Sequence, residues 1–399
     1  MTFSIPELYL RKGADRRLRG GHLWVYSNEI DTKRSPLSAF TAGDPVAVVA
    51  SDGTLFGTAY MEPNNLICAR LCVPGQRVAL DEAFFTTAVD RARQLREMSF
   101  DRPFYRLVYG DSDLLPGLVV DRYGDYLVVQ LNNSGIERYE AQILAALTAS
   151  LKPTGILLRA DSRSRREQGL ENRVEIVFGE VPDEVPLEEN GVHFLAPVAS
   201  GQKTGWFYDH RISRSRLSAY VVGKSVLDVY SYIGGWGLQA AAFGASAVTC
   251  VDSSESALAG VTRNAELNSL ADRVNTIRGQ ADEVMTDLHN SGKTFDLVIL
   301  DPPAFIQRRK DLKKGINAYR RINELGLRVL KPGGLLVSGS CSMHLGRAEL
   351  NDALQGAAQR NKCQLRIIEQ GAQGPDHPIH PAIPETEYLK AVFARKIIL

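Results

Sequence analysis

The sequence lacks long apolar runs, and it lacks a surplus of charge of either sign. A membrane-spanning helix needs roughly 18 to 20 consecutive apolar residues, whereas the most apolar region, Leu238 to Val251, is mostly Ala and Gly with Ser and Thr among them. The 47 Lys and Arg residues nearly balance the 46 Asp and Glu residues and leave a net charge of +1. We therefore expect no membrane insertion, and only local clusters of charge can indicate a nucleic-acid partner.

Cysteine is also scarce, and its spacing predicts neither a disulfide framework nor a metal site. The chain has five cysteines, an odd number. Cys68 and Cys72 fall in an alternating apolar run without companion ligands, so we predict no zinc site and no other metal. The N-terminal stretch mixes acidic and basic residues and has no apolar core, which is not the pattern of a secretory signal. We expect a cytoplasmic protein.

The length and the periodicity predict several domains. A chain of 399 residues is about two to three times the size of a typical domain. Short strand-like segments between Gly, Asp and Pro turns predict a small β module over residues 1–75. The block 76–188 mixes helical periodicity with strands, which predicts an α+β domain. The expected strands of these two blocks are residues 22–27, 45–50, 55–60, 66–72, 126–130, 155–159 and 174–178, and the expected helices are 81–98 and 139–151.

Strands and helices alternate strictly in residues 189–399, which predicts a parallel, doubly wound, Rossmann-like sheet. We expect two closing strands, and the final one should be antiparallel. The expected strands are residues 225–232, 247–252, 274–279, 295–300, 334–339, 364–369 and 387–396, and the expected helices are 235–243, 255–269, 319–330 and 348–360.

Acidic residues follow three successive strands of this block, at the sheet edge where open α/β sheets bind ligands. Asp228 precedes a Gly-rich turn that lacks the G-x-G-x-x-G spacing, and its carboxylate would repel a phosphate. It suits a ligand with an ammonium group, such as the methionine part of S-adenosylmethionine. Asp252 could then accept the ribose hydroxyls, and Asp282 could meet the adenine amino group. The turn after Asp228 contains Tyr230, Ser231, Gly234, Gly235 and Gly237.

This run resembles the cofactor motifs of the class I S-adenosylmethionine-dependent methyltransferases, and the resemblance covers about residues 190–399. A single acid at a strand end is more often a helix cap. Three of them after a Gly-rich loop are harder to explain in that way.

The fourth strand ends in Asp301-Pro302-Pro303-Ala304-Phe305, where two prolines fix the backbone. In methyltransferases such a motif usually faces the acceptor, and its aromatic ring stacks on a planar substrate. Alone, it indicates methylation of an exocyclic nitrogen of a base, with Asp301 also close to the cofactor.

The fifth strand ends with Cys341 between Ser340 and Ser342. A cysteine here is either a passive buried thiol or a nucleophile. A thiolate is needed when the acceptor is carbon 5 of a pyrimidine, because addition of sulfur to carbon 6 makes carbon 5 nucleophilic. Asp301 could hydrogen-bond the N3 or amino edge of the ring and favour that addition.

The whole chain is similar to a narrower family, the bacterial cytosine-carbon-5 methyltransferases of large-subunit ribosomal RNA with an N-terminal PUA domain. Further matching motifs are residues 201–211 before the first strand of the sheet, and residues 113–118 and 121–123. The resemblance implies that Cys341 is the nucleophile, that 23S rRNA is the substrate and that the protein is a homodimer. It also implies that Gln202, Lys203 and Tyr208 belong to a loop over the cofactor. Where related RNA enzymes commonly have a second cysteine after the proline, this chain has Ala304, so the proton acceptor stays unassigned.

Basic clusters indicate how RNA could be held. Arg16 and Arg17 precede His22 and Trp24 in a segment that resembles the opening of a PUA domain and offers phosphate contacts and stacking surfaces. Trp24 could equally belong to the core, and the arginines could form a solvated face. Residues 304–331 hold nine basic and two acidic residues directly after the acceptor motif, which suits an anionic polymer. The residues that we expect to contact RNA are Arg16, Arg17, His22, Trp24, Pro302, Pro303, Phe305, Arg308, Arg309 and Lys310.

The sequence thus predicts a multidomain α/β enzyme with a PUA-like β-barrel, a central α+β domain and a methyltransferase domain. Two alternatives stay open. The enzyme could methylate an exocyclic nitrogen of an rRNA base, or the chain could be a PUA-type ribosome-assembly factor without catalysis.

Overall fold

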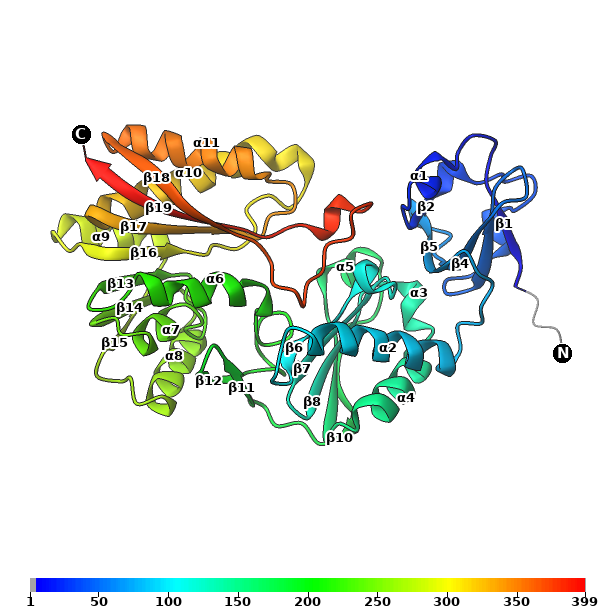
Figure 1. Ribbon diagram of the computed structural model, residues 1–399, viewed down its shortest axis with the longest axis horizontal. Helices are drawn as coiled ribbons and strands as arrows, with labels where there is room; N and C mark the ends of the chain where they lie inside the picture. Colours follow the sequence, from blue (N-terminus) through cyan, green and yellow to red (C-terminus); the bar gives the residue numbers. More distant parts are fainter. Residues whose placement is uncertain (1–4, 399) are drawn as a thin grey trace. The chain divides into compact units, whose positions relative to one another are not determined.

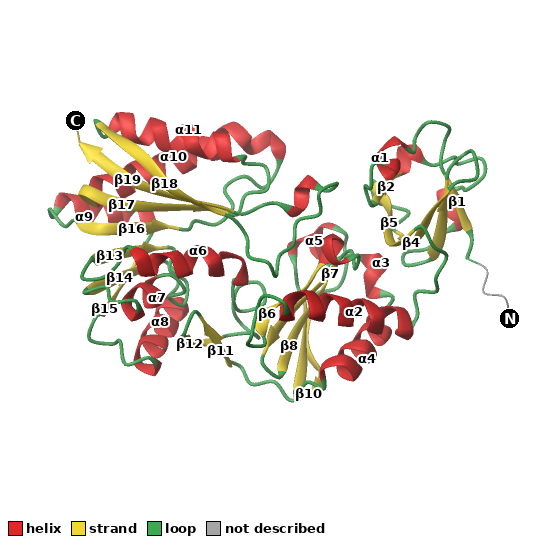
Figure 2. Ribbon diagram, in the orientation of Figure 1, coloured by secondary structure: helices red, strands yellow, loops and turns green. Residues whose placement is uncertain are grey.

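The computed structural model describes residues 5–398 and divides into two compact units (Figures 1 and 2). The first unit contains the chain up to residue 185, with residues 197–206 and 375–386. The second unit contains residues 186–196, 207–374 and the segment from residue 387 on. The PUA-like and central modules predicted from the sequence both fall in the first unit, and the doubly wound sheet falls in the second.

The first module of the first unit is a five-stranded sheet of order β1-β3-β4-β5-β2. β1 runs parallel to β3, and the other pairs are antiparallel. Its alternating apolar residues form one core that includes Leu8, Val25, Val46 and Met61. The strands are β1 (Glu7–Tyr9), β2 (Trp24–Tyr26), β3 (Pro45–Val49), β4 (Leu55–Met61) and β5 (Ile67–Pro74), with helix α1 (Arg16–Arg19).

The central module is a sheet of order β10-β9-β8-β7-β6 whose core includes apolar residues of α2 and α4. Its elements are α2 (Glu82–Glu97), β6 (Phe104–Tyr109), β7 (Leu118–Tyr123), β8 (Tyr126–Leu131), α3 (Ser134–Glu137), α4 (Glu140–Leu151), β9 (Gly155–Ala160), α5 (Arg163–Glu167) and β10 (Arg173–Gly179). β6 and β7 were not among the predicted strands. Each carries a buried charge, and Arg106 Nη2 of β6 pairs with Asp121 Oδ2 of β7 at 2.8 Å. The charged residues within β6 and β7 interrupt the apolar pattern from which strands are predicted, so the two strands were missed.

The second unit is built on a seven-stranded sheet of order β15-β14-β13-β16-β17-β19-β18. Five strands are parallel, and β19 is antiparallel to both neighbours, which confirms the expected direction of the final strand. The strand order reverses at β13, and open α/β sheets bind ligands in a crevice at such a switch point, which here lies between the carboxyl ends of β13 and β16. The strands are β13 (Ser225–Val229), β14 (Ala247–Asp252), β15 (Val274–Arg278), β16 (Phe295–Leu300), β17 (Leu330–Ser340), β18 (Cys363–Gly371) and β19 (Lys390–Ile398).

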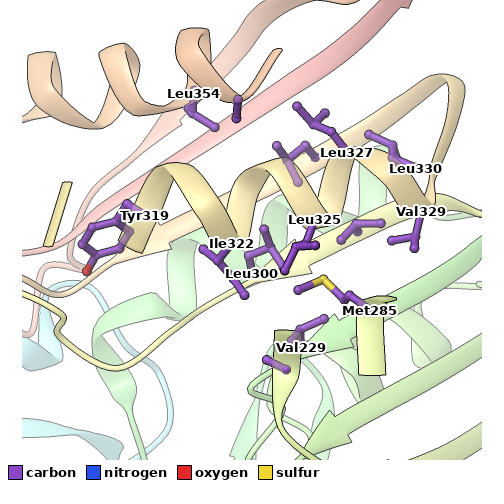
Figure 3. Close-up of a cluster of buried hydrophobic side chains, with 14 of the residues drawn as sticks. Val229, Met285, Leu300, Tyr319, Ile322, Leu325, Leu327, Val329, Leu330 and Leu354 are labelled. Atoms are coloured by element: carbon purple, nitrogen blue, oxygen red, sulfur yellow. The ribbon is translucent and has the colours of Figure 1, made fainter. Parts of the chain in front are cut away.

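Helices cover both faces of this sheet, with α9, α10 and α11 on one face and α7 and α8 on the other (Figures 1 and 2). Figure 3 shows the first of these interfaces, where Tyr319, Ile322 and Leu325 of α10 pack near Leu300 and Met285. The helices are α6 (Arg211–Ser215), α7 (Gly237–Ala242), α8 (Glu255–Leu267), α9 (Ala281–Asn290), α10 (Leu312–Val329) and α11 (Arg347–Arg360). A short hairpin of β11 (Val185–Glu189) and β12 (Val192–Ala196) precedes them.

The short helices α1, α3, α5 and α6 were not predicted, and two longer helices of the second unit also differ from the prediction. α9 was not predicted, and α10 begins seven residues before the predicted start at Tyr319, at Leu312. The early turns of α10 are rich in Lys and contain Gly315, whose added Cβ would overlap Ile306 Cγ1. Glycine has a low helix propensity, and here it is required by close packing against Ile306. The start of α10 therefore cannot be predicted from helix propensity.

Candidate active site

Asp228 is the penultimate residue of β13, next to the point where the strand order reverses, and it is fully buried. Its Oδ2 accepts a hydrogen bond from Gly237 N at 2.8 Å, whereas Oδ1 has no hydrogen-bond partner among the described residues. Burial raises the pKa of Asp228 to about 7, and the carboxylates of Asp301 and Asp252 act in the same direction. An uncompensated buried carboxylate is costly unless a cation approaches it, so the site fits the ammonium group expected from the sequence.

The turn after Asp228 has an unusual backbone. Tyr230 and Tyr232 have positive φ values of 66° and 50°, in a region that residues other than glycine rarely adopt. Gly237 leaves no space for a side chain, because a Cβ there would lie 2.6 Å from Cys250 Sγ and 3.0 Å from Asp228 Oδ2. The turn is thus held in a strained conformation close to a buried acid, a feature that clusters at functional sites.

The remaining predicted turn residues lie within this same segment. Ser231, Gly234 and Gly235 are buried, and Tyr230 is half-buried. The amide of Ser231 donates to Val251 O at 3.0 Å, which ties the turn to the end of β14.

Asp252, the last residue of β14, is fixed by two backbone amides. Its Oδ2 accepts from Tyr232 N at 2.9 Å and its Oδ1 accepts from Ser254 N at 2.9 Å. Each carboxylate oxygen keeps a second lone pair, so this half-buried residue can still accept two hydroxyl groups. The structure therefore brings Asp252 together with the turn that follows Asp228.

Asp282 lies further out, in the first turn of α9. Its side chain is 49% exposed and Oδ2 is 3.6 Å from Arg321 Nη2. Burial and the negative charge of Asp282 both raise the pKa of Tyr230, a residue of the turn after Asp228. The predicted adenine contact is thus compatible with its position, although Asp282 is less enclosed than Asp228 and Asp252.

Asp301 directly follows β16 and lies next to the rings of Trp236 and His210. Trp236 Nε1 donates to its Oδ2 at 2.9 Å, and His210 Nε2 lies 3.2 Å from its Oδ1. Burial would raise the pKa of Asp301, but the nearby His210 imidazole and the hydrogen bond from Trp236 outweigh it, so the pKa is lowered overall. Asp301 therefore stays ionised in the crevice.

The residues after Asp301 lead to α10. Pro302 is buried and Pro303 is exposed. The Phe305 ring lies 4.9 Å from the Tyr319 ring, centroid to centroid, with an interplanar angle of 57°. Phe305 is thus partly engaged within the protein, and only its remaining exposed surface is available for a substrate base.

Cys341 follows β17 on a turn that is clamped from both sides. The flanking Ser340 and Ser342 are buried, whereas Cys341 is half-exposed. Ser340 Oγ donates to Tyr319 Oη at 2.9 Å, and Tyr319 Oη also lies 2.9 Å from Ser342 Oγ. Ser342 Oγ accepts from Ile306 N at 3.3 Å, which connects the turn to the chain that follows Asp301.

The other four cysteines differ from Cys341. All four are buried, and burial raises the pKa of Cys68 to about 12. A thiol in such surroundings is a poor nucleophile. Among the described residues, Cys341 is therefore the cysteine best placed to meet a ligand.

The predicted RNA-contacting residues lie in both units. Arg308, Arg309 and Lys310 of the second unit are exposed and precede α10. In the first unit Arg16 is exposed, and the guanidinium group of Arg17 pairs with Glu29 at 2.6 Å and covers the Tyr26 ring at 4.1 Å.

Trp24 is half-buried in the first unit, and its Nε1 donates to Asp111 Oδ1 at 2.6 Å. The His22 ring packs against it at 5.4 Å. Trp24 therefore has a structural role whether or not its remaining surface stacks on RNA. Gln202 and Lys203 are exposed residues of the first unit, whereas Tyr208 is buried in the second.

Four residues that contact Asp301 or the turn of Cys341 were not predicted from the sequence: His210, Trp236, Tyr319 and Lys390. His210 and Trp236 lie in segments that were singled out, but nothing in the sequence shows which ring reaches Asp301. For Lys390 a signal exists, because a lysine inside an otherwise apolar strand is rarely buried without a partner.

No helix within residues 5–398 is both long enough and apolar enough to cross a membrane. The same described residues contain no cluster of three or more His, Cys, Asp or Glu side chains that could hold a metal ion.

Comparisons with known proteins give two family matches. A PUA-like domain matches residues 8–72, and an S-adenosylmethionine-dependent methyltransferase matches residues 141–395. Ribosomal RNA large subunit methyltransferase I of Aliivibrio fischeri is 35% identical over 403 residues, which cover 100% of both chains. The Vibrio cholerae protein of the same name is 34% identical over 400 residues, which cover 98% of this chain and 100% of the relative.

Two solved structures resemble the full chain. A protein described as a methyltransferase and crystallised with SAH has a TM-score of 0.83 at 22% identity, covering 98% of this chain and 100% of the other. A Streptococcus mutans protein described as a SAM-dependent methyltransferase has a TM-score of 0.81 at 21% identity, with the same coverage. At these identities the two structures show a shared fold.

Proposed function

Because this chain belongs to the S-adenosylmethionine-dependent methyltransferase family and matches ribosomal RNA large subunit methyltransferase I proteins at full length, we propose that it methylates carbon 5 of a cytosine in 23S rRNA. The observation that supports this chemistry is the position of Cys341. It is half-exposed on a clamped turn that directly follows β17, the strand paired with β16, and Asp301 directly follows β16. An accessible cysteine is the group that could add to carbon 6 of a cytosine, and the ionised Asp301 follows the neighbouring strand.

We infer that the crevice between β13 and β16 holds the cofactor. Asp228 would pair with its ammonium group, Asp252 would accept its ribose hydroxyls, and Asp282 would meet its adenine. When bound, S-adenosylmethionine supplies an electrophilic methyl group. The strained turn of Tyr230, Ser231, Gly234, Gly235 and Gly237 would lie against it, with Tyr208 of the same unit as a further contact.

Cys341 would act on the opposite face of the base. Its sulfur forms a bond to carbon 6, and an electron pair moves to carbon 5, which can then accept a methyl group. Asp301 would hold the N3 or amino edge of the ring and favour this addition. Removal of the carbon 5 proton by a base returns the electron pair and breaks the bond between sulfur and carbon.

The basic segment after Phe305 and the PUA-like module would bind the RNA backbone. Arg308, Arg309 and Lys310 are exposed next to the acceptor motif, which suits phosphate contacts. Pro302, Pro303 and Phe305 would border an unpaired or flipped base. In the first unit, Arg16, Arg17, His22 and Trp24 would add contacts.

Loss-of-function analysis of rRNA tests the reaction. Mass spectrometry of 23S rRNA from cells that lack the protein should show one missing 5-methylcytidine, which returns when the wild-type gene is added back. The Cys341→Ala protein should not restore it, although calorimetry should show unchanged S-adenosylmethionine binding. Restoration by Cys341→Ala would contradict the nucleophile, and loss of an N-methylated base would favour exocyclic methylation by the Asp301-Pro302-Pro303 motif.

Unchanged rRNA modification and no S-adenosylmethionine binding would instead favour a PUA-type ribosome-assembly factor without catalysis. We further propose a cytoplasmic homodimer. Sedimentation velocity should give a species of twice the chain mass of 43.9 kDa. A single species of 43.9 kDa, the monomer mass, would contradict the dimer.

A further inference from the structure

A lysine at the start of the last strand lies beside the turn that carries Cys341. The register between β17 and β19 places Lys390 directly opposite Ser340. The Lys390 side chain is buried, and its Nζ donates to Ser342 O and Tyr388 O at 2.7 Å each. Its ammonium group therefore lies against the residue that follows Cys341.

The two carbonyl contacts satisfy hydrogen bonds but do not neutralise the charge. Burial lowers the pKa of Lys390 to about 8, and the leading opposing influence is the charge of Cys341, which favours the ammonium form. The interaction is mutual, because an ammonium group that is favoured by a thiolate also favours that thiolate.

Other charges also reach this place. Arg347 and Glu349 belong to α11, and Glu387 precedes β19. On the α10 side, the Tyr319 hydroxyl faces the Cys341 turn. Arg347 opposes the positive charge of Lys390, whereas the two glutamates support it.

We propose that Lys390 is the counter-ion that keeps the Cys341 sulfur in its thiolate form, a role that rests on the proposed function of Cys341 as nucleophile. The thiol proton goes to solvent water, the sulfur keeps the electron pair, and the adjacent ammonium group stabilises the charge. When the sulfur is expelled from carbon 6 at the end of the reaction, the same ammonium group stabilises the departing thiolate. Lys390 acts through Cys341 and is therefore a positioning residue.

The strand offers a matched control. Lys396, also on β19, is buried, and its Nζ donates to two carbonyls, Leu327 O and Leu330 O, at 2.7 Å each. It lies near Cys363 rather than Cys341. Replacement of Lys396 removes the same kind of buried ammonium without touching the Cys341 turn.

The test is the pH profile of Cys341 alkylation in the full-length protein. Iodoacetamide modification is followed at the Cys341 peptide by mass spectrometry between pH 5.5 and 10 in wild type, Lys390→Met, Lys390→Arg and Lys396→Met. A neighbouring positive charge lowers a thiol pKa by about 1 unit or more. Lys390→Met should therefore raise the midpoint by about one pH unit and slow alkylation at pH 7 about tenfold.

Lys390→Arg should keep the wild-type midpoint, because a guanidinium group stays charged throughout this range. Lys396→Met should also keep it. An unchanged midpoint in Lys390→Met, or an equal shift in Lys396→Met, would overturn the proposal. If Lys390→Met does not fold, as judged by circular dichroism, Lys390→Arg decides: a raised midpoint overturns the proposal and a retained midpoint supports it.

Failure of the proposed function gives a different result. In that case Cys341→Ala keeps full methylation activity, whatever the alkylation profile of the Lys390 variants. If only the Lys390 proposal is wrong, Cys341→Ala still abolishes methylation, but the midpoint of Cys341 alkylation is the same in wild type and Lys390→Met.

Discussion

The surroundings of Asp228 oppose its own negative charge. Its side chain is fully buried and one carboxylate oxygen has no hydrogen-bond partner among the described residues. Such a group is retained where a ligand supplies the missing charge. Two predictions follow from the direction of its pKa shift.

The first prediction concerns cofactor affinity. Because burial raises the pKa of Asp228 to about 7, the carboxylate must lose a proton before it can pair with an ammonium group. The affinity for S-adenosylhomocysteine, which keeps that ammonium group, should therefore weaken up to about tenfold for each pH unit below 7. Calorimetric titration from pH 5.5 to 8.5 measures this, and Asp228→Asn should bind weakly at every pH. A steep profile that persists in Asp228→Asn would contradict the assignment.

The second prediction concerns stability. Since the folded-state pKa of Asp228 lies above its ordinary value of 3.8, ionisation opposes folding, and this cost is fully present above about pH 7. Asp228→Asn should thus raise the Tm of the ligand-free protein by at least about 3 °C at pH 8 and by less at pH 5. Differential scanning calorimetry gives both values. A lower Tm at pH 8 would show that this carboxylate stabilises the fold.

Asp296 is the matched control on the same sheet. Although burial opposes it, hydrogen bonds from Ser225 and Lys331 lower the pKa of Asp296 to about 2. A lowered pKa contributes stability that is present above the ordinary pKa and lost only as the pH falls towards 2. Asp296→Asn should therefore lower the Tm at both pH 5 and pH 8, opposite in sign to Asp228→Asn.

At the scale of elements, α10 organises the acceptor side of the crevice. Its Tyr319 holds Ser340 and Ser342 on either side of Cys341, and its ring packs on Phe305. One helix residue therefore fixes both the turn of Cys341, the proposed nucleophile, and Phe305, which follows Asp301.

Tyr319→Phe should keep the ring packing but release the turn. We expect a loss of about 1 to 2 kcal/mol in stability, because one hydroxyl serves two buried serines, and a fall in kcat of at least about tenfold at a nearly unchanged KM for RNA. Steady-state kinetics with an rRNA fragment provides the measurement. Tyr60→Phe is the control, since it removes a buried hydroxyl bonded to Pro116 O in the first unit. Equal losses of kcat in both variants would contradict a role specific to the turn.

The loop before α10 supports a prediction on RNA binding. Replacement of Arg308, Arg309 and Lys310 by Gln should weaken binding and reduce the slope of log K against log salt by up to about 2, since each phosphate contact to single-stranded RNA contributes roughly 0.7. Fluorescence anisotropy at several salt concentrations measures the slope. The control triple, Lys224, Arg273 and Lys293, is exposed at the amino ends of β13, β15 and β16, the opposite edge of the sheet. An equal effect of both triples would indicate non-specific attraction.

Periodicity and strand-end residues predicted most of the second unit. The predicted ranges 247–252 and 295–300 coincide with β14 and β16. Of the three acids, Asp252 is the last residue of β14 and Asp228 the penultimate residue of β13, whereas Asp282 lies in the first turn of α9, four residues after β15. The failures have physical causes. Arg106 and Asp121 pair with each other inside β6 and β7, so their charges do not mark a surface.

The contacts of the crevice depend on tertiary packing and could not be predicted from local sequence. His210 reaches Asp301 across 91 positions of the chain, and Lys390 reaches Ser342 across 48. Residues at the carboxyl ends of parallel strands can be predicted to share one edge of the sheet. Side chains that reach this edge from other elements cannot be predicted in this way.

At the scale of the whole molecule, the chain combines a PUA-like module with a methyltransferase sheet in an almost neutral protein. Specificity for RNA must then come from local basic segments rather than net charge. The presence of both modules in one chain agrees with its full-length similarity to rRNA methyltransferases.

Covalent trapping on RNA shows whether the Cys341 sulfur adds to the cytosine ring. Large-subunit rRNA transcribed with 5-fluorocytidine is incubated with the protein and S-adenosylmethionine, and the products are separated on a denaturing gel. Fluorine cannot leave carbon 5 as a proton does, so wild type should form a stable protein–RNA adduct that peptide mass spectrometry assigns to Cys341. If ordinary rRNA is methylated while the fluorinated RNA gives no adduct, or gives one at another residue, the account is contradicted.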